Sequence, residues 1–287
     1  MPGGLLDPSA VRQLATRLSL RPTKQRGQNF VTDANTVRRL VTLAGLEPDD
    51  VALEIGPGLG SLTLGLLERA RHVVAVEIEP SLAEQLPRTV AERMPDAVER
   101  LTVLEADALR VDELPEPKPS VVVANLPYNV SVPVLLHLLA IEPSWTRGLV
   151  MVQSEVADRL VAGPGSRTYG VPSVKMAWWA EATRVGTVPP TVFWPVPNVD
   201  SGLVRLQRRE PPDTPATREQ VFTVVDAAFG QRRKMLRAAL AGLAGSSAAA
   251  SAHLEAAGVD PQARGETLTV TDFARIAASL YAHPPQG

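Results

Sequence analysis

Short apolar runs rich in β-branched residues recur along the first two thirds of the chain, and they are continuous rather than alternating. Runs of this kind are typical of strands that are buried on both faces of a parallel sheet. They predict strands near 51–55, 73–77, 101–104, 120–125 and 148–152, and two more within 173–188 and 199–207. Because helical patterns separate these runs, we expect a doubly wound α/β sheet across residues 26–208.

The regions on either side of this sheet have different patterns. Residues 1–25 are predicted to form an N-terminal extension that is partly helical around 11–18. The proline-rich stretch 210–215 indicates a linker, and an Ala-rich helical pattern follows, with breaks at 246–251 and Gly258 and a last helix that starts at Thr271-Asp272. We therefore predict a small all-α C-terminal domain at 209–287, after a catalytic domain at 26–208.

Composition narrows the class of protein. The chain has 287 residues, 45% of them hydrophobic, and no cysteine, which excludes disulfides and thiolate metal sites. The apolar runs are shorter than a membrane span, and the first thirty residues lack a signal-peptide core. The four histidines are scattered without the spacing of metal ligands. We expect a cytoplasmic protein that needs no metal, has no membrane partner and is a monomer by default.

The tetrapeptide Asn125-Leu126-Pro127-Tyr128 follows the buried run 120–124. The Asn125 side-chain oxygen and the Leu126 carbonyl are two acceptors that can hold both protons of an adenine amino group, and Tyr128 can stack on the base. Phe193, in a loop with four prolines between 188 and 197, is placed to close the other face of such a pocket. The alternatives are an ordinary strand-ending turn and a Phe193 that only anchors its loop to the core.

A second motif lies upstream. Gly56-Pro57-Gly58-Leu59-Gly60 joins a strand to a helix, and glycines in such a turn let the backbone approach a ligand closely. Glu77 ends the next strand, where an acid can accept both hydroxyls of a ribose. Glu54 suits a ligand that carries positive charge, and Asp107 can accept from an adenine amine. The loop alone does not exclude a nicotinamide dehydrogenase, but such an enzyme has no use for the tetrapeptide at 125–128.

With these motifs the chain resembles the rRNA adenine N6-methyltransferases, and among them the bacterial small-subunit rRNA adenine dimethyltransferases. The resemblance runs from about residue 20 to 282 and rests on the segments 28–31, 54–60, 76–79, 107–109, 125–129, 193–197, 229–236 and 264–268. Val31 departs from the leucine that is more frequent in the family, and Trp194 is bulkier than the usual residue at its position.

The resemblance implies a Rossmann-like, seven-stranded S-adenosylmethionine-dependent methyltransferase sheet with a helical RNA-binding domain. It implies transfer of methyl groups to N6 of two adjacent adenosines near the 3′ end of 16S rRNA in the immature small ribosomal subunit, with S-adenosylhomocysteine as product. The implied catalytic residues are Asn125, Leu126, Pro127, Tyr128 and Phe193. The implied cofactor-binding residues are Gln28, Asn29, Val31, Glu54, Gly56, Gly58, Gly60, Glu77, Ile78, Asp107, Ala108 and Asn125.

The charge distribution is compatible with an RNA partner although the net charge is −2. Basic residues concentrate in three groups, and acids lie elsewhere, so basic patches can follow a phosphate backbone. Arg233 and Arg237 are predicted to lie one helical turn apart. The residues expected to bind RNA are Arg232, Arg233, Lys234, Arg237, Arg205 and Arg208. The alternative is that each group is only a solvated face.

Two other functions stay open from the sequence. The macrolide-resistance methyltransferases share the cofactor loop and the tetrapeptide but modify large-subunit (23S) rRNA. A ribosome-assembly factor that acts mainly by binding would retain the same site, because an intact active site is compatible with both roles.

Overall fold

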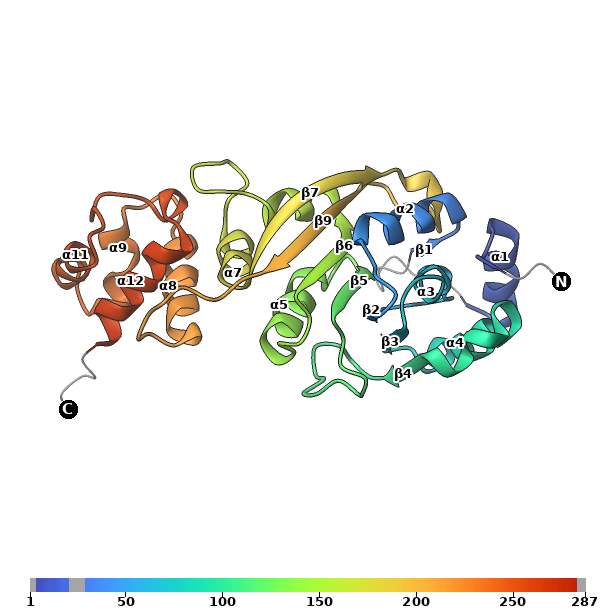
Figure 1. The fold of residues 1–287 in the computed structure, drawn as a ribbon. Helices are drawn as coiled ribbons and strands as arrows, with labels where there is room; N and C mark the ends of the chain where they lie inside the picture. The colour runs from blue at the N-terminus through green and yellow to red at the C-terminus, as the bar shows by residue number, and fades with distance from the viewer. Residues whose placement is uncertain (1–3, 21–28, 283–287) are drawn as a thin grey trace. The chain divides into compact units, whose positions relative to one another are not determined.

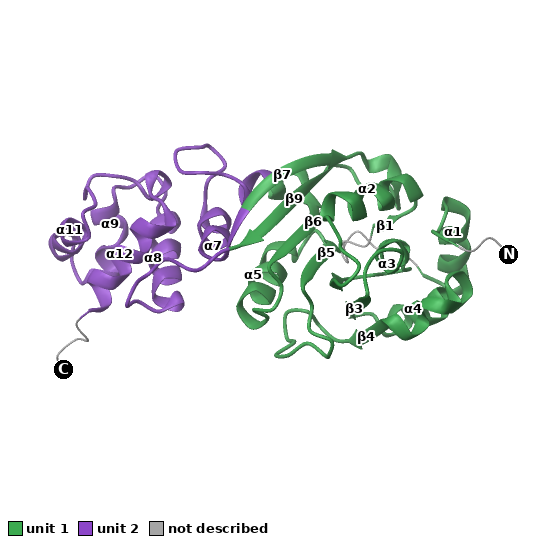
Figure 2. Cartoon of the chain, viewed as in Figure 1, with its two compact units in different colours: residues 1–157, 182–208 green, residues 158–181, 209–287 purple. Residues whose placement is uncertain are grey.

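The computed structural model describes residues 4–20 and 29–282 (Figure 1). The chain forms two compact units, coloured separately in Figure 2. The first unit contains residues 1–157 and 182–208, and the second contains residues 158–181 and 209–287. Each unit has a hydrophobic core of its own.

The first unit is built on a seven-stranded sheet with the strand order β4-β3-β2-β5-β6-β9-β7. Strands β2 to β6 pair in parallel, whereas β9 runs antiparallel to β6. All seven predicted strands are confirmed, although residues 171–179 form a helix before the sixth of them. The strands are β2 (Val51–Ile55), β3 (His72–Glu77), β4 (Leu101–Glu105), β5 (Val121–Asn125), β6 (Arg147–Gln153), β7 (Ala180–Val188) and β9 (Ser201–Arg208).

Helices cover both faces of this sheet (Figure 1). On one face, apolar residues of α1 to α4 pack in one core with alternate strand residues such as Val121, Val123, Leu149 and Met151. On the other face lies α5. Arg208 of β9 points to this face and donates to the carbonyls of Leu139 in α5 and of Glu142 directly after it. The helices are α1 (Pro8–Arg17), α2 (Ala34–Ala44), α3 (Ser61–Leu67), α4 (Pro80–Arg93), η2 (Pro95–Arg100), α5 (Ser131–Ile141) and α6 (Ser154–Leu160).

The units differ from the predicted domain limits at two places. The predicted extension contains α1, which buries Val11, Leu14 and Ala15 in the core of the first unit. The spacing of these residues, i, i+3 and i+4, places them on one helix face, so this helix belongs to the unit. Residues 158–181 lie in the second unit rather than with the sheet, because Val174 and Trp178 are buried in its core.

Two further short elements lie within the predicted proline-rich loop. Residues Pro190–Val192 form a 3₁₀ turn, η3, and β8 (Phe193–Trp194) pairs antiparallel with β1 (Phe30–Val31). The prediction that the proline-rich stretch between 188 and 197 is a loop is therefore wrong for these five residues. Two residue pairs, Phe30 with Trp194 and Val31 with Phe193, join the segment before α2 to the segment before β9.

The second unit is helical and encloses a core around Val224, Leu254 and Phe273. The predicted break at 246–251 is confined to its start, because Ser246 caps α11 by accepting from the Ala249 amide. The last helix is capped by Thr269, which pairs with Asp272, rather than by Thr271. Its helices are α7 (Val171–Trp179), α8 (Arg218–Gly230), α9 (Leu236–Ala239), α10 (Ala241–Ala244), α11 (Ser247–Ala256), η4 (Gly265–Thr267) and α12 (Val270–Tyr281).

Within the described residues, no helix has the length and apolar character that crossing a membrane requires.

Candidate active site

A cavity of about 500 Å³ opens at the carboxyl edge of the parallel strands. Its wall combines the glycine loop after β2, the ends of β3 and β5, and the turn after β4. In an open parallel sheet the ligand site is expected at this edge, beside the point where the strand order reverses. Among the described residues the predicted site residues that line it are Asn29, Gly56, Gly58, Glu77, Ile78, Asp107, Ala108, Asn125, Leu126, Pro127 and Tyr128.

The glycine loop needs its glycines for conformation. Gly56, Gly58 and Gly60 have φ values of +67°, +57° and +93°, a region that side-chain-bearing residues rarely adopt. A Cβ at Gly58 would lie 2.7 Å from the ring of Phe30. Gly60 does not line the cavity; a Cβ there would meet Leu86 at 2.8 Å, so this glycine serves packing against α4.

Glu77 ends β3 with its carboxylate held by the backbone. Its two oxygens accept from the amides of Gly58 and Glu79, each at 3.0 Å. Burial raises the pKa of Glu77, while these amide hydrogen bonds lower it in part. Each carboxylate oxygen retains a further lone pair, so the residue can accept from ligand hydroxyls in the cavity.

Glu54 lies near the end of β2, just before the glycine loop, and is not part of the cavity wall. It is 2% exposed, and its Oε2 accepts from Thr63 Oγ1 at 2.6 Å. Burial raises the pKa of Glu54 to about 8. The predicted direct contact with a cationic ligand therefore differs from the structure, in which Glu54 joins the end of β2 to α3.

The part of the cavity wall next to Glu77 combines apolar side chains with the acids Glu79 and Asp107. Ile78 is 63% exposed and lines the cavity, which accounts for a large apolar side chain at the surface. Ala108 lines the cavity as well. Asp107 Oδ1 accepts from the Leu109 amide at 2.9 Å, and this bond fixes the carboxylate at the start of the turn after β4.

The tetrapeptide 125–128 forms the opposite wall. Asn125 Nδ2 donates to the Asn29 carbonyl at 3.1 Å, so the amide is oriented with Oδ1 remaining as an acceptor. The Leu126 amide donates to the Met151 carbonyl at 3.0 Å, which fixes the peptide unit between Asn125 and Leu126. The Tyr128 hydroxyl lies 2.8 Å from Ser201 Oγ, and burial raises the pKa of this phenol above its usual value of 10.0.

Besides Glu54 and Gly60, three more predicted residues lie elsewhere or outside the described part. Phe193 is 2% exposed in the core and is not among the described residues of the cavity wall, so the predicted role at a base face gives way to the alternative of an anchor. Val31 is also buried, and its carbonyl accepts from Ser61 Oγ at 2.6 Å. Gln28 lies outside the described residues.

Two of the predicted RNA-binding arginines hold helix ends. Arg205 Nη2 donates to the Leu43 carbonyl of α2 at 3.2 Å, and Arg208 donates to the carbonyls of Leu139 and Glu142 at the end of α5. Cations bind well at helix C-termini, where carbonyls lack intrahelical partners. Arg208 is thereby engaged inside the unit, and its guanidinium also lies over the ring of Trp145.

The basic group of the second unit is divided in a similar way. Arg232 donates to Glu266 Oε2 at 2.9 Å and to the Arg167 carbonyl at 3.0 Å, so it joins the loop 163–168 to η4. Arg233 lies in the turn before α9, not one helical turn from Arg237 on the same helix, because α9 begins at Leu236. Sequence reasoning missed the exposed Arg167 and Arg264, which only the fold places beside this group.

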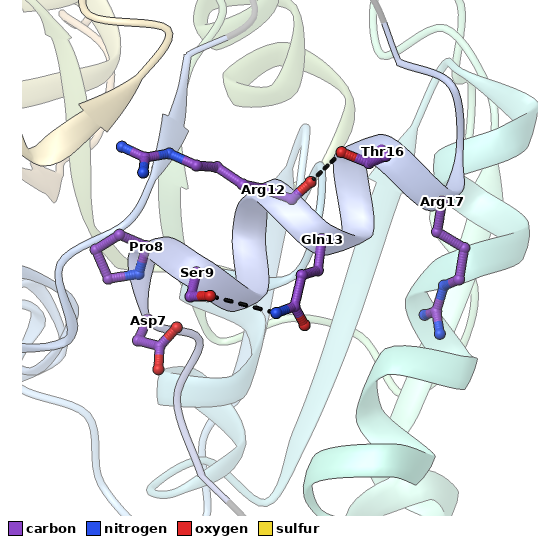
Figure 3. A pocket seen from close by; sticks show the side chains of 7 residues that line it. All are labelled: Asp7, Pro8, Ser9, Arg12, Gln13, Thr16 and Arg17. Atoms are coloured by element: carbon purple, nitrogen blue, oxygen red, sulfur yellow. Dashed lines mark hydrogen bonds between the residues drawn. The ribbon is translucent and has the colours of Figure 1, made fainter.

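A second hollow, of about 840 Å³, lies beside α1 (Figure 3). Its wall comes from that helix and its N-cap residue, and most of the polar groups there pair with neighbouring groups. Asp7 accepts from the Ala10 amide, Gln13 donates to Ser9, Thr16 donates to the Arg12 carbonyl, and Arg17 pairs with Glu92. The hollow brings together no catalytic set of side chains.

The main cavity fits the nucleoside-containing cofactor that the sequence motifs imply. Glu77 presents carboxylate oxygens for hydroxyls, Ile78 and Ala108 an apolar surface for a planar base, and Asp107 an acceptor for an amine. No group of three or more potential metal ligands occurs among residues 4–20 and 29–282.

The fold and this site together define the class. The sheet, its glycine loop and its helical partner unit form a Rossmann-like methyltransferase fold, in agreement with two solved structures. The 23S rRNA methyltransferase ErmE is 29% identical, with a TM-score of 0.62 and coverage of 88% of this chain and 100% of that one. A dimethyladenosine transferase from Plasmodium falciparum shares the fold at 23% identity, with a TM-score of 0.71 and coverage of 86% and 95%.

The chain belongs to the ribosomal RNA adenine dimethylase family, whose model matches residues 20–281. It is 65% identical over 282 residues to the ribosomal RNA small subunit methyltransferase A of Cutibacterium acnes, covering 96% of this chain and 95% of that protein. The protein of the same name from Kineococcus radiotolerans is 66% identical over 283 residues, with coverage of 99% and 93%.

Proposed function

We propose that the protein transfers methyl groups from S-adenosylmethionine to N6 of two adjacent adenosines near the 3′ end of 16S rRNA, giving N6,N6-dimethyladenosines. The observation that carries this proposal is the position of Asn125, Leu126 and Tyr128 on the wall of the cavity that also contains Glu77 and Asp107. A base and a nucleoside cofactor would thus meet in one space. The names of the relatives with 65% and 66% identity support the small-subunit target.

The cofactor-binding residues we propose are those on the cavity wall. Glu77 would accept from the ribose hydroxyls, Asp107 from the adenine amine, and Ile78 would cover the adenine ring. Gly56 and Gly58 allow close approach of the backbone. S-adenosylmethionine, when bound, supplies an electrophilic methyl group.

On the side of the substrate, Asn125 and Leu126 would orient the adenine amine. Its lone pair is delocalised into the ring, and two acceptors that hold both N–H groups favour a pyramidal, more nucleophilic nitrogen. The bond from Asn125 Nδ2 to Asn29 keeps Oδ1 available for this purpose. An amide takes up no proton near neutral pH, so Asn125 acts by orientation, which can lower a barrier by about 7–11 kcal/mol.

Tyr128 would supply the aromatic face. A base must leave its stack to reach the cavity, and stacking on an aromatic side chain offsets part of that cost, at roughly 1–3 kcal/mol per base. An adenosine in a single-stranded loop is therefore the expected target. Phe193 is left out of this proposal because it is buried in the core.

We further propose that the RNA is bound as part of an immature small subunit, by a cytoplasmic monomer, with Arg233, Lys234 and Arg237 in contact with phosphates. These three side chains are exposed, and no partner for them occurs within the described residues. Arg232 would act indirectly, by holding the loop that carries Arg167.

A large-subunit target is the second candidate function. The likeness to ErmE supports it, because that structure covers 88% of the chain. The identity to ErmE is 29%, against 65% to the small-subunit methyltransferase of Cutibacterium acnes, and this difference favours the small subunit.

Incorporation of labelled methyl groups from S-adenosylmethionine tests the proposal. Purified undermethylated small subunits and large-subunit RNA are supplied separately. Label in the small subunit that approaches four methyl groups per particle would support two dimethyladenosines. Label in the large-subunit RNA alone would favour the second candidate, and cofactor binding without any label would favour an assembly factor that acts by binding.

A further inference from the structure

Ser201 is the first residue of β9, and its side chain is fully buried. β9 runs antiparallel to β6, so its start lies beside the carboxyl end of β6, with Ser201 opposite Gln153. β6 runs parallel to β5, and there Met151 pairs with Asn125. The reversed direction of β9 therefore brings Ser201 to the edge of the sheet at which the cavity opens.

Tyr128 lies in the turn that follows β5. The Val130 amide closes this turn on the Pro127 carbonyl at 3.2 Å. The turn fixes the backbone, but the phenol can still rotate about its side-chain torsions. The hydrogen bond between the Tyr128 hydroxyl and Ser201 Oγ, 2.8 Å long, joins the far end of the ring to a strand in the core.

This bond is favoured because the buried Ser201 hydroxyl needs a hydrogen-bond partner. Within the described residues, the Tyr128 hydroxyl is the one hydrogen-bond partner of Ser201 Oγ. A buried hydroxyl without a partner is unfavourable, so burial of Ser201 favours this pairing. The ring of Tyr128 is consequently held at the cavity wall before a base enters.

We propose that Ser201 is a positioning residue for the target base: its hydroxyl holds the Tyr128 ring in the orientation on which an unstacked adenine stacks. This inference rests on the proposed function. Burial keeps the Tyr128 phenol neutral by raising its pKa, so its hydroxyl serves as an anchor and not as a proton acceptor. The cavity then has a fixed aromatic face beside the fixed amide of Asn125.

A double-mutant cycle tests the bond. Ser201→Ala, Tyr128→Phe and the double variant are compared in single-turnover methylation of undermethylated small subunits. Each single variant is expected to slow the methyl transfer about two- to tenfold, the effect of one hydrogen bond. The double variant is expected to be no slower than either single one, because both changes delete the same bond. The dissociation constant of the cofactor, measured by calorimetry, should stay unchanged.

Ser120→Ala is the matched control. Its hydroxyl donates to Asp50 Oδ1 at 2.7 Å in the same unit, at the amino end of β5 and away from the cavity. It is expected to lower the thermal unfolding midpoint without changing the rate. A full rate in Ser201→Ala, or losses in the two single variants that multiply in the double one, would overturn the inference.

Two further results keep the test decisive. If Ser201→Ala does not fold, Tyr128→Phe still removes the bond from the tyrosine side, and a full rate in that variant would overturn the inference. Failure of the unaltered protein to methylate small subunits would count against the proposed function, whereas a normal rate in the unaltered protein with no effect of Ser201 counts against the inference alone.

Discussion

Glu54 and Glu77 show how two acids on adjacent strands differ in their surroundings. Glu77 accepts from two backbone amides, whereas within the described residues Glu54 has one donor, the Thr63 hydroxyl. A carboxylate with fewer donors is less compensated for the loss of water. The pKa of Glu54 is accordingly raised to about 8, and that of Glu77 is raised as well.

This difference predicts a pH-dependent stability. An acid whose pKa is higher in the folded state stabilises the fold below its unfolded value, near 4.5, and loses that contribution as the pH rises through about 8. The glutamine in Glu54→Gln cannot ionise. The variant should therefore lose less of its free energy of unfolding between pH 5 and 8, by at most about 4–5 kcal/mol. Urea unfolding at three pH values measures this. Parallel pH profiles for the variant and the unaltered protein would refute the role of Glu54.

Asn125 and Glu77 line the same cavity, but substitutions at the two positions should affect different steps. Asn125→Ala removes the acceptor for the adenine amine and should slow methyl transfer about a hundredfold, the scale of a lost positioning contact. Cofactor affinity should be retained. Glu77→Ala is the converse control, expected to weaken cofactor binding in calorimetry. An Asn125→Ala variant that methylates at the full rate would exclude the proposed contact.

At the scale of elements, the glycine loop and the two-stranded β1–β8 sheet depend on each other. Phe30 of β1 occupies the space beside Gly58, and a Cβ there would lie 2.7 Å from its ring. The same strand segment presents the Asn29 carbonyl to Asn125. A change at Gly58 should therefore affect both the cofactor side and the base side of the cavity.

Gly58→Ala is expected to destabilise the fold and weaken cofactor binding. The left-handed conformation alone costs an alanine roughly 1–2 kcal/mol, and the displaced Phe30 adds to that cost. Thermal unfolding and calorimetry measure the two effects. Gly163→Ala, at an exposed position with nothing within 4 Å of the new Cβ, is the matched control and should change neither. Equal unfolding midpoints for the two variants would contradict the argument.

The parallel strands were predictable because a strand buried on both faces leaves an uninterrupted apolar run, as at 121–124. The ends of those runs marked Glu77, Asp107 and Asn125, which the fold brings to one cavity. Phe193 was not placed correctly and Ser201 was not singled out, because their surroundings depend on the pairing of β8 with β1 and on the antiparallel direction of β9. Such pairings join residues far apart in the chain and leave no local pattern.

At the scale of the whole molecule, the net charge of −2 does not show that the basic residues differ in their surroundings. In the first unit Arg208 is half-buried and donates to helix carbonyls, whereas Arg205 is exposed and donates to the Leu43 carbonyl. Arg233 and Lys234 are exposed in the second unit. Charge counted from the sequence therefore overstates the basic surface of the first unit, and only the exposed cations are available to release counterions from a phosphate backbone.

A salt titration of RNA binding separates these two kinds of arginine. Binding to small-subunit RNA should weaken linearly in log salt, with a slope of about 0.7–0.9 for each phosphate contact. The double variant Arg233→Ala with Lys234→Ala should reduce that slope by one to two contacts and leave the unfolding midpoint unchanged. Arg208→Ala should instead lower the unfolding midpoint and leave the salt slope unchanged, because it leaves the Leu139 and Glu142 carbonyls without their donor. An unaltered slope in the double variant would mean that Arg233 and Lys234 are only solvated, and that other cations meet the RNA.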